Sequence, residues 1–278
     1  MSMVKHETVV LKEVQLHYAE TTGAGPALIL LHGITDSHVS YLPVMSELAA
    51  VWHVYALDMR GHGLSGHCPG AYRVLDYARD LQSFLHVVVR ERAVLAGHSL
   101  GALVATCAAG DLGEGVRGVF LEDPPMYTAS MPAIKDTATY SLFVSWREIL
   151  IKHAATGGSA DDLLEPIVDT VSPARLHTRA EQLHQLDPQV LDAVIEGTLC
   201  AGFNPDEVLA RVVCPTHMLA ADHDLGGALH EADVQRLVSK MPHCSYAVLE
   251  KVGHDIHHEW PGAYMRQLHG FLNILEKN

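Results

Sequence analysis

The chain has few positive charges, and none of them gather into runs. Lysine and arginine total 19 against 33 aspartates and glutamates, which gives a formal net charge of -14, and no stretch contains five consecutive basic residues. An acidic surface repels both phosphate backbones and anionic lipid headgroups. We therefore expect neither nucleic acid nor a membrane surface as a partner.

Cysteine pairs and long apolar runs are also missing. The five cysteines are scattered and include no C-x-x-C pair, which favours free thiols in a reducing compartment over a disulfide framework. No segment approaches the roughly 18 apolar residues that a membrane span needs. The opening stretch MSMVKHETVVLKEV is interrupted by charges, unlike a signal peptide. We expect a cytoplasmic protein.

Apolar residues and histidine are plentiful. With 278 residues, 48% of them hydrophobic, the chain can form one large domain, or a domain with an insertion, around a substantial core. Protonating all 20 histidines would reverse the sign of the formal charge. We therefore expect solubility and activity to change steeply in mildly acid conditions.

Short aliphatic runs alternate with longer segments of helical period, which is typical of parallel strands joined by crossover helices. The pattern predicts strands at residues 14–18, 27–31, 53–57, 93–96, 116–121, 216–220 and 246–249. It predicts helices at residues 41–50, 75–89, 100–109, 231–240 and 261–275.

The alternation stops once, where strand signals disappear and several helical stretches follow one another. We interpret residues 126–203 as a helical insertion, with residues 1–125 and 204–278 forming the α/β core. The first long helix of the insertion, around residues 137–153, carries enough apolar side chains to cover another surface.

The segment VLAGHSLGA places Ser99 in a G-x-S-x-G pattern between a predicted strand and a helix of small residues. This is the context of a nucleophile elbow, in which a strained turn exposes the serine at the carboxyl edge of a sheet. Gly97 and Gly101 leave room for neighbouring backbone. The hydroxyl also faces a helix N-terminus, whose free N–H groups favour developing negative charge. We interpret Ser99 as a catalytic nucleophile.

Five landmarks in order give the chain a resemblance to the α/β-hydrolase superfamily, in its serine branch with a helical lid, over nearly the full length. They are LLHGITDS, ALDMRGHGLS, GHSLG, LAADHDLGG and VGHDIHHEWP. The resemblance implies a mostly parallel central sheet flanked by helices, with a helical lid. It also implies an oxyanion hole made by the backbone N–H groups of Ile34 and Leu100.

The resemblance identifies His254, in the loop after the last strand, as the base that a serine nucleophile requires. His98 adjoins Ser99 in sequence, but neighbouring residues of an elbow point apart, so we expect it to flank the pocket. A metal site formed by His254, His257 and His258 is disfavoured because the segment lacks H-E-x-x-H spacing and no cysteine pair assists.

Four carboxylates follow predicted strands and could orient the base: Glu122, Asp123, Asp222 and Asp224. The commonest family pattern places the acid three residues after a small residue that closes the late strand, and this implies Asp224. Some members instead carry the acid before the lid, where Glu122 and Asp123 lie. Asp222 is a further alternative, or else a turn residue.

Together these assignments predict a serine hydrolase that cleaves a carboxylic ester or lactone through an acyl-enzyme, with no cofactor and no metal. The reactants would be a small to medium hydrophobic acyl compound and water, and the chain would be a monomer or a homodimer. His98, Tyr127, Phe143 and Trp146 are the expected pocket residues. A carbon–carbon hydrolase of ring-cleavage products and a hydrolase-like ligand receptor remain as alternatives.

Overall fold

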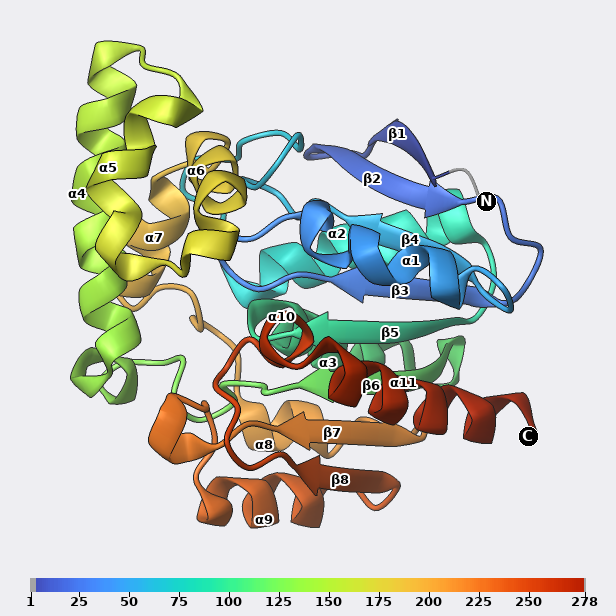
Figure 1. The fold of residues 1–278 in the computed structure, drawn as a ribbon. Coiled ribbons are helices and arrows are strands. Elements are labelled where there is room, and N and C mark those ends of the chain that lie inside the picture. The colour runs from blue at the N-terminus through green and yellow to red at the C-terminus, as the bar shows by residue number, and fades with distance from the viewer. Residues whose placement is uncertain (1–3, 278) are drawn as a thin grey trace.

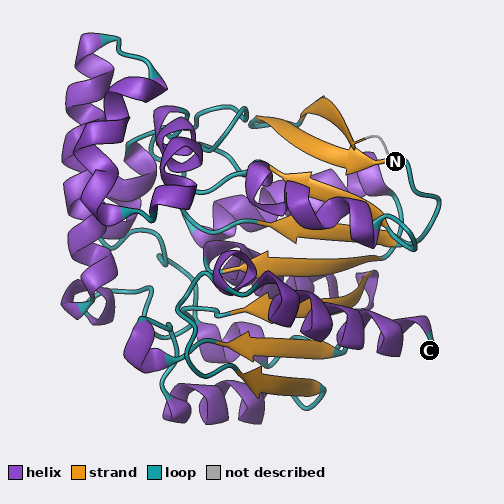
Figure 2. Ribbon diagram, viewed as in Figure 1, coloured by secondary structure: helices purple, strands orange, loops and turns teal. Residues whose placement is uncertain are grey.

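The computed structural model describes residues 4–277, so residues 1–3 and 278 of the predicted core lie outside the described residues. Its centre is an eight-stranded sheet with the order β1-β2-β4-β3-β5-β6-β7-β8 (Figures 1 and 2). The strands are β1 (Val4–Val10), β2 (Gln15–Thr21), β3 (Ala27–Leu31), β4 (His53–Leu57), β5 (Ala93–His98), β6 (Val116–Glu122), β7 (Thr216–Ala220) and β8 (Cys244–Val248).

Strands β3 to β8 run parallel, whereas β1 and β2 form an antiparallel edge. The central strands β3 and β5 are buried along their whole length, as expected of parallel strands covered on both faces. The predicted mostly parallel sheet is confirmed. Strand β1 was not predicted, because its segment VKHETVV is largely exposed and carries three charged or titratable side chains.

Helices cover both faces of the sheet because successive strand side chains point to opposite sides. Leu28 and Leu30 pack in the cluster of the α1 and α11 side, and Ile29 and Leu31 in the cluster of the α2 and α3 side. The helices are α1 (Leu42–Leu48), α2 (Val74–Phe84), α3 (Leu100–Leu112), α4 (Ala138–Thr156), α5 (Leu164–Ile167), α6 (Leu176–His184), α7 (Gln189–Ile195), α8 (Pro205–Leu209), α9 (Glu231–Lys240), α10 (Ile256–Glu259) and α11 (Pro261–Glu276).

Every element that the structure describes between β6 and β7 is helical. Figure 1 shows α4 to α7 stacked beyond the carboxyl ends of the parallel strands. The longest helix, α4, begins where the Thr137 side chain accepts a hydrogen bond from the backbone N–H of Tyr140. It ends at Gly157, whose φ of 66° is the left-handed conformation that terminates many helices.

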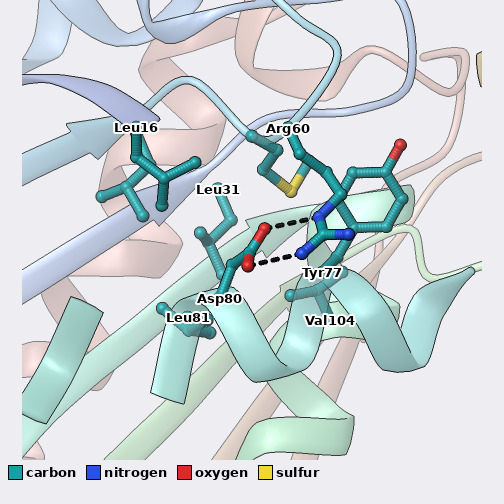
Figure 3. Close-up of a pocket in the computed structure, with 9 residues that line it drawn as sticks. Leu16, Leu31, Arg60, Tyr77, Asp80, Leu81 and Val104 are labelled. Atoms are coloured by element: carbon teal, nitrogen blue, oxygen red, sulfur yellow. Dashed lines mark hydrogen bonds and ion pairs between the residues drawn. The ribbon is translucent and has the colours of Figure 1, made fainter. Parts of the chain in front are cut away.

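The DMRGHG loop after β4 is anchored by a buried ion pair. Arg60 donates from Nε to Oδ2 and from Nη2 to Oδ1 of Asp80 on α2, both at 2.6 Å (Figure 3). The cavity beside this pair measures about 10 Å³, room for a single water at most. The ion pair therefore fixes this loop against α2.

Candidate active site

Ser99 stands at the junction of β5 and α3 in the strained conformation of a nucleophile elbow. Its backbone has φ 51° and ψ -114°, a conformation that residues other than glycine rarely adopt. The flanking glycines are required by space: a Cβ on Gly97 would lie 2.3 Å from the Gly101 carbonyl oxygen, and one on Gly101 would lie 2.1 Å from that of Leu31. The strand–turn–helix arrangement predicted from VLAGHSLGA is therefore present.

Two backbone N–H groups beside Ser99 are free to bind an anion. Within residues 4–277, neither the N–H of Ile34 nor that of Leu100 has a hydrogen-bond acceptor. Leu100 opens α3, where the first N–H groups lack intrahelical partners. Residues 32–37, between β3 and the next helical turn, form the Ile34 loop. This loop is close to the serine, because a Cβ on Gly33 would lie 3.4 Å from the Ser99 Cβ. These are the two donors that the resemblance implied.

His254 lies between β8 and α10 and pairs with Asp123. Its Nδ1 is 2.5 Å from Asp123 Oδ2, so a protonated Nδ1 donates to the carboxylate. Asp123 is fully buried, and its oxygens also accept from the backbone N–H groups of Ala221, at 3.1 Å, and Ala228, at 2.8 Å. These donors hold the carboxylate in one orientation.

The expectation that Asp224 orients His254 is wrong in geometry. Asp224 is exposed on the short 3-10 helix η8 (His223–Leu225), and its N–H donates to Asp222 Oδ1 at 3.1 Å. Asp222 is a turn residue, which was one of its two expected roles. Its carboxylate also accepts a hydrogen bond from the Lys251 N–H at 2.9 Å. The late-strand loop therefore closes on itself, and its carboxylates do not contact the base.

Strand order explains why Asp123 takes this place. Strand β6 adjoins β5, with Glu122 in register with His98, so the next residue, Asp123, lies level with Ser99. The Ser99 N–H donates to the Glu122 carbonyl oxygen at 3.0 Å. Strand β7 is one position further from the elbow. An acid after β6 is therefore nearer to the serine than one after β7.

Glu122, the other acid considered at this position, supports a different histidine. Its Oε1 accepts from the backbone N–H of His257 at 2.7 Å and contacts His257 Nδ1 at 2.8 Å. Burial raises the pKa of Glu122 to about 7 and lowers that of His257 to about 4. Glu122 therefore secures α10, which carries His257 and is separate from the final helix α11.

The electrostatics of His254 suit a base that is held by an acid. Burial alone would lower the pKa of His254, but the hydrogen bond and negative charge of Asp123 raise it to about 9. The imidazolium that forms when the ring accepts a proton is therefore stabilised. The ring remains partly accessible, with 30% of its side chain exposed.

The residues predicted to line the pocket make the following contacts. His98 is 3% exposed and contacts the His254 carbonyl oxygen through Nε2 at 3.1 Å, so it supports the loop of the base. The Tyr127 hydroxyl donates to Asp206 Oδ1 at 3.1 Å. Phe143 and Trp146 are buried within the hydrophobic core, and Trp146 Nε1 donates to Thr170 Oγ1 at 3.0 Å. None of these contacts marks a substrate-binding position.

Sequence reasoning missed the polar contacts between α6 and the Ile34 loop. Arg179 donates from Nη1 to the Thr35 carbonyl oxygen at 2.7 Å and to Thr35 Oγ1 at 3.0 Å. Gln182 donates to the buried carboxylate of Asp36. The helical insertion is thus bonded directly to the segment that follows the Ile34 N–H.

The loop that carries His254 is bonded to Arg175, the residue that immediately precedes α6. Arg175 Nη1 lies 2.5 Å from Oδ2 of Asp255, the residue after His254. Burial alone would raise the pKa of Asp255, but His98 and Arg175 lower it well below its ordinary range. No sequence signal could have identified these pairs, because Arg175 and Asp255 are separated by 80 residues.

Comparison with known proteins identifies the family of the chain. Residues 28–266 match the alpha/beta hydrolase family. The chain is similar to N-formylmaleamate deformylase of Pseudomonas putida, with 29% identity over 252 residues and 87% of each chain covered. It is similar over 115 residues, at 36% identity and 41% of each chain, to 2-(acetamidomethylene)succinate hydrolase of Mesorhizobium japonicum.

A solved structure of N-formylmaleamic acid deformylase from Pseudomonas putida S16 superposes with a TM-score of 0.78 at 25% identity, covering 95% of this chain and 100% of that one. Among residues 4–277, no helix has both the length and the apolar character that crossing a bilayer requires. The family match extends from β3 into α11 and includes the elbow, the Ile34 loop and His254. The chain belongs to the alpha/beta hydrolase family and is a hydrolase of that type.

Proposed function

We propose that the protein is a serine hydrolase that works through an acyl-enzyme, with Ser99, His254 and Asp123 as its catalytic triad. The observation that carries the proposal is the contact of His254 Nδ1 with the buried Asp123 carboxylate, on the strand next to the elbow. This contact fixes the proton on Nδ1 and leaves Nε2 to accept a proton from the serine hydroxyl.

The chemistry follows from these positions. Ser99 Oγ attacks the substrate carbonyl carbon while its proton passes to His254 Nε2, and the N–H groups of Ile34 and Leu100 bind the oxyanion. Collapse of the tetrahedral intermediate breaks the bond to the leaving group, which takes the proton from Nε2. Water then attacks the acyl-enzyme with His254 again as base, and releases the acid and the free serine.

For the substrate, we propose a carboxylic ester or lactone of a small to medium hydrophobic compound. Esters have better leaving groups than amides, so this triad and oxyanion hole suffice for them. A second candidate is an N-acyl amide, which is supported by the similarity to a deformylase over 87% of both chains. Residues 126–203 would form the lid over this substrate, as supported by the bonds from Arg179 and Gln182 to the Ile34 loop.

The proposal includes the reducing cytoplasm as the working compartment, which is supported by the five cysteines, all of them free thiols.

The test is a panel of activated esters, lactones and N-formyl or N-acetyl amides, assayed with the wild type, Ser99→Ala and Ser239→Ala. Ser239 is an exposed serine on α9 and serves as the matched control. We expect Ser99→Ala to lose at least roughly 1000-fold in turnover, and Ser239→Ala to match the wild type. Intact-mass measurement during turnover should detect an acyl adduct only where Ser99 is present. Activity retained by Ser99→Ala would refute the serine mechanism.

A further inference from the structure

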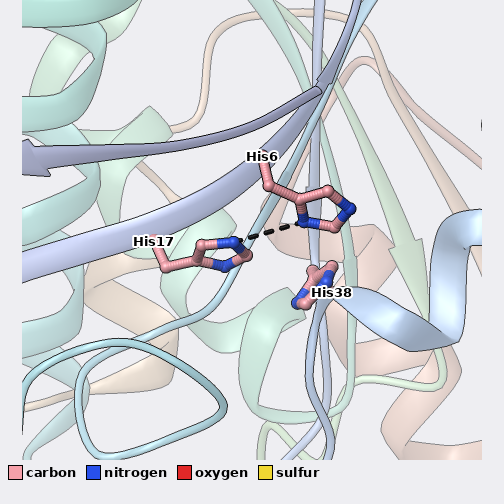
Figure 4. Close-up of side chains that lie close together, drawn as sticks. All are labelled: His6, His17 and His38. Carbon is pink, nitrogen blue, oxygen red and sulfur yellow. Dashed lines mark hydrogen bonds between the residues drawn. The ribbon is translucent and has the colours of Figure 1, made fainter. Parts of the chain in front are cut away.

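Three histidines from separate segments meet at the antiparallel edge of the sheet: His6 on β1, His17 on β2 and His38 on the 3-10 helix η1 (His38–Tyr41) (Figure 4). One ring nitrogen of each lies within 4.8 Å of the other two. His6 Nδ1 and His17 Nε2 are 3.3 Å apart, and the ring centroids of His17 and His38 are 4.7 Å apart. We call these three residues the histidine cluster.

The fold brings the cluster together through strand register and a helix cap. Strand β1 pairs His6 with Ala19 and Thr8 with His17, so His6 and His17 are diagonal neighbours on one face of the sheet. Ser37 caps the start of η1 and thereby places His38 against the same face. His6 is exposed, whereas His17 and His38 are buried.

A buried carboxylate beneath the cluster orients two of the rings. Asp58 Oδ2 lies 2.8 Å from His17 Nδ1, and Asp58 Oδ1 lies 2.9 Å from His38 Nδ1. With both Nδ1 atoms donating to a carboxylate, the second nitrogen of each ring is unprotonated and presents a lone pair that can bind a metal ion.

We propose that His6, His17 and His38 bind a divalent transition-metal ion of the Zn²⁺ type, with water as the fourth ligand. Imidazole nitrogens suit Zn²⁺, and a carboxylate that fixes the far side of a ligating ring is the usual support of such sites. Zn–N bonds of about 2.0–2.1 Å in a tetrahedral site place nitrogens roughly 3.4 Å apart. The separation of His6 Nδ1 and His17 Nε2 already matches this value.

The bound ion would join the β1–β2 hairpin to η1, which begins two residues after Asp36 in the Ile34 loop. Its role would be structural, since none of the three histidines belongs to the proposed triad. Metal binding to the folded state alone stabilises that state by mass action. We therefore expect Zn²⁺ to raise the melting temperature of the protein.

The test measures Zn²⁺ binding by calorimetry, with the full chain stripped by EDTA and then dialysed. The variants are His6→Ala and, as a matched control, His86→Ala, which removes an exposed histidine far from the cluster in sequence. We expect one site per chain with a Kd of about 10 µM or tighter. Loss of one ligand should weaken this site by at least about tenfold in His6→Ala, while His86→Ala keeps the wild-type affinity.

Two further readouts separate this site from adventitious binding to other histidines. Co²⁺ should give the intense visible absorption of a tetrahedral site in the wild type and in His86→Ala, but not in His6→Ala. Saturating Zn²⁺ should raise the melting temperature of the wild type by about 5 °C, and that of His6→Ala much less. Zn²⁺ affinity unchanged in His6→Ala, or no site tighter than about 100 µM in the wild type, would overturn the proposal.

Discussion

Asp123 Oδ2 lies 2.5 Å from His254 Nδ1, although the two residues are 131 positions apart in the chain. The contact joins the loop after β6 to the loop after β8, and the strand that carries Asp123 adjoins the strand that leads to Ser99. This pairing is the reason why we propose Asp123 as the acid of the triad.

Replacing Asp123 with Asn should therefore lower kcat by roughly 10³- to 10⁴-fold, because the amide no longer stabilises the imidazolium or its Nδ1–H tautomer. The matched control is Asp224→Asn, since Asp224 is exposed and bonded within its own turn. Steady-state kinetics on an activated ester measure both variants. Equal losses in the two, or a larger loss in Asp224→Asn, would contradict the assignment.

The pH profile of kcat/KM should depend on the same pair. His254 must be neutral to accept the serine proton, and Asp123 raises its pKa above the ordinary value of 6.5. As the pH rises past the raised pKa of His254, kcat/KM should increase, so the rising part of the profile should lie above pH 6.5. In Asp123→Asn the hydrogen bond and charge of Asp123 no longer raise the pKa of His254, while burial still lowers it. The limb of the residual activity should therefore move to lower pH by about one unit or more.

Asp224→Asn provides the reference for this shift, and its profile should coincide with that of the wild type. A profile of Asp123→Asn that rises at the same pH as the wild type would show that Asp123 does not set the pKa of the base.

Gly101 is the position where the elbow has least space. An added Cβ would lie 2.1 Å from the Leu31 carbonyl oxygen, so Gly101→Ala should cost about 3 kcal/mol or more of unfolding free energy, or prevent folding. Gly270 is the control, because nothing lies within 4 Å of a Cβ there and the residue is inside α11. Gly270→Ala should stabilise the protein by about 0.5–1 kcal/mol.

Chemical denaturation followed by circular dichroism gives both free energies. If Gly101→Ala were as stable as the wild type, the close packing of the elbow against β3 would be disproved.

Arg179 should matter for catalysis although it lies on the insertion. It bonds to the Thr35 carbonyl oxygen at 2.7 Å, and Thr35 follows Ile34, the proposed oxyanion donor. Arg179→Met should displace that donor and lower kcat/KM by roughly 10- to 100-fold. It should also increase the protease sensitivity of residues 126–203.

Arg147→Met is the comparison for Arg179→Met. Arg147 pairs at 2.5 Å with Asp192 inside the insertion and is 37% exposed, so its loss should change little. Kinetics on an activated ester and limited proteolysis measure the two variants together. Indistinguishable behaviour would show that the α6 contact does not position the oxyanion loop.

Local pattern was a reliable guide to most of the fold. Predicted strands 27–31, 53–57 and 216–220 and helix 231–240 coincide with β3, β4, β7 and α9, because buried parallel strands and amphipathic helices have strong periodic signals. The edge strand β1 gave no such signal, because it is stabilised by pairing with β2 and its side chains are largely exposed. Edge strands of this kind are visible only once their partner is known.

The candidate site also contains residues that local sequence predicts and residues that it does not. The residues of the elbow and its glycines follow from their own segment, since the steric demands of a strand–turn–helix are local. His254 was identified from its position after the last strand and the resemblance that this carries. The choice among Glu122, Asp123, Asp222 and Asp224 was not local, and the commonest pattern of the family led to Asp224, whereas the carboxylate that contacts His254 is that of Asp123.

The residue order of this chain was thus enough to predict most of the sheet and the elbow at Ser99, because these depend on a few neighbouring residues. The resemblance to the α/β-hydrolase superfamily added His254 and the N–H groups of Ile34 and Leu100 as candidates. The partner of His254, the anchoring of the insertion through Arg179 and the meeting of His6, His17 and His38 were decided only by the fold. Each of these depends on which strands and loops become neighbours in space, and that is set by the packing of the whole domain.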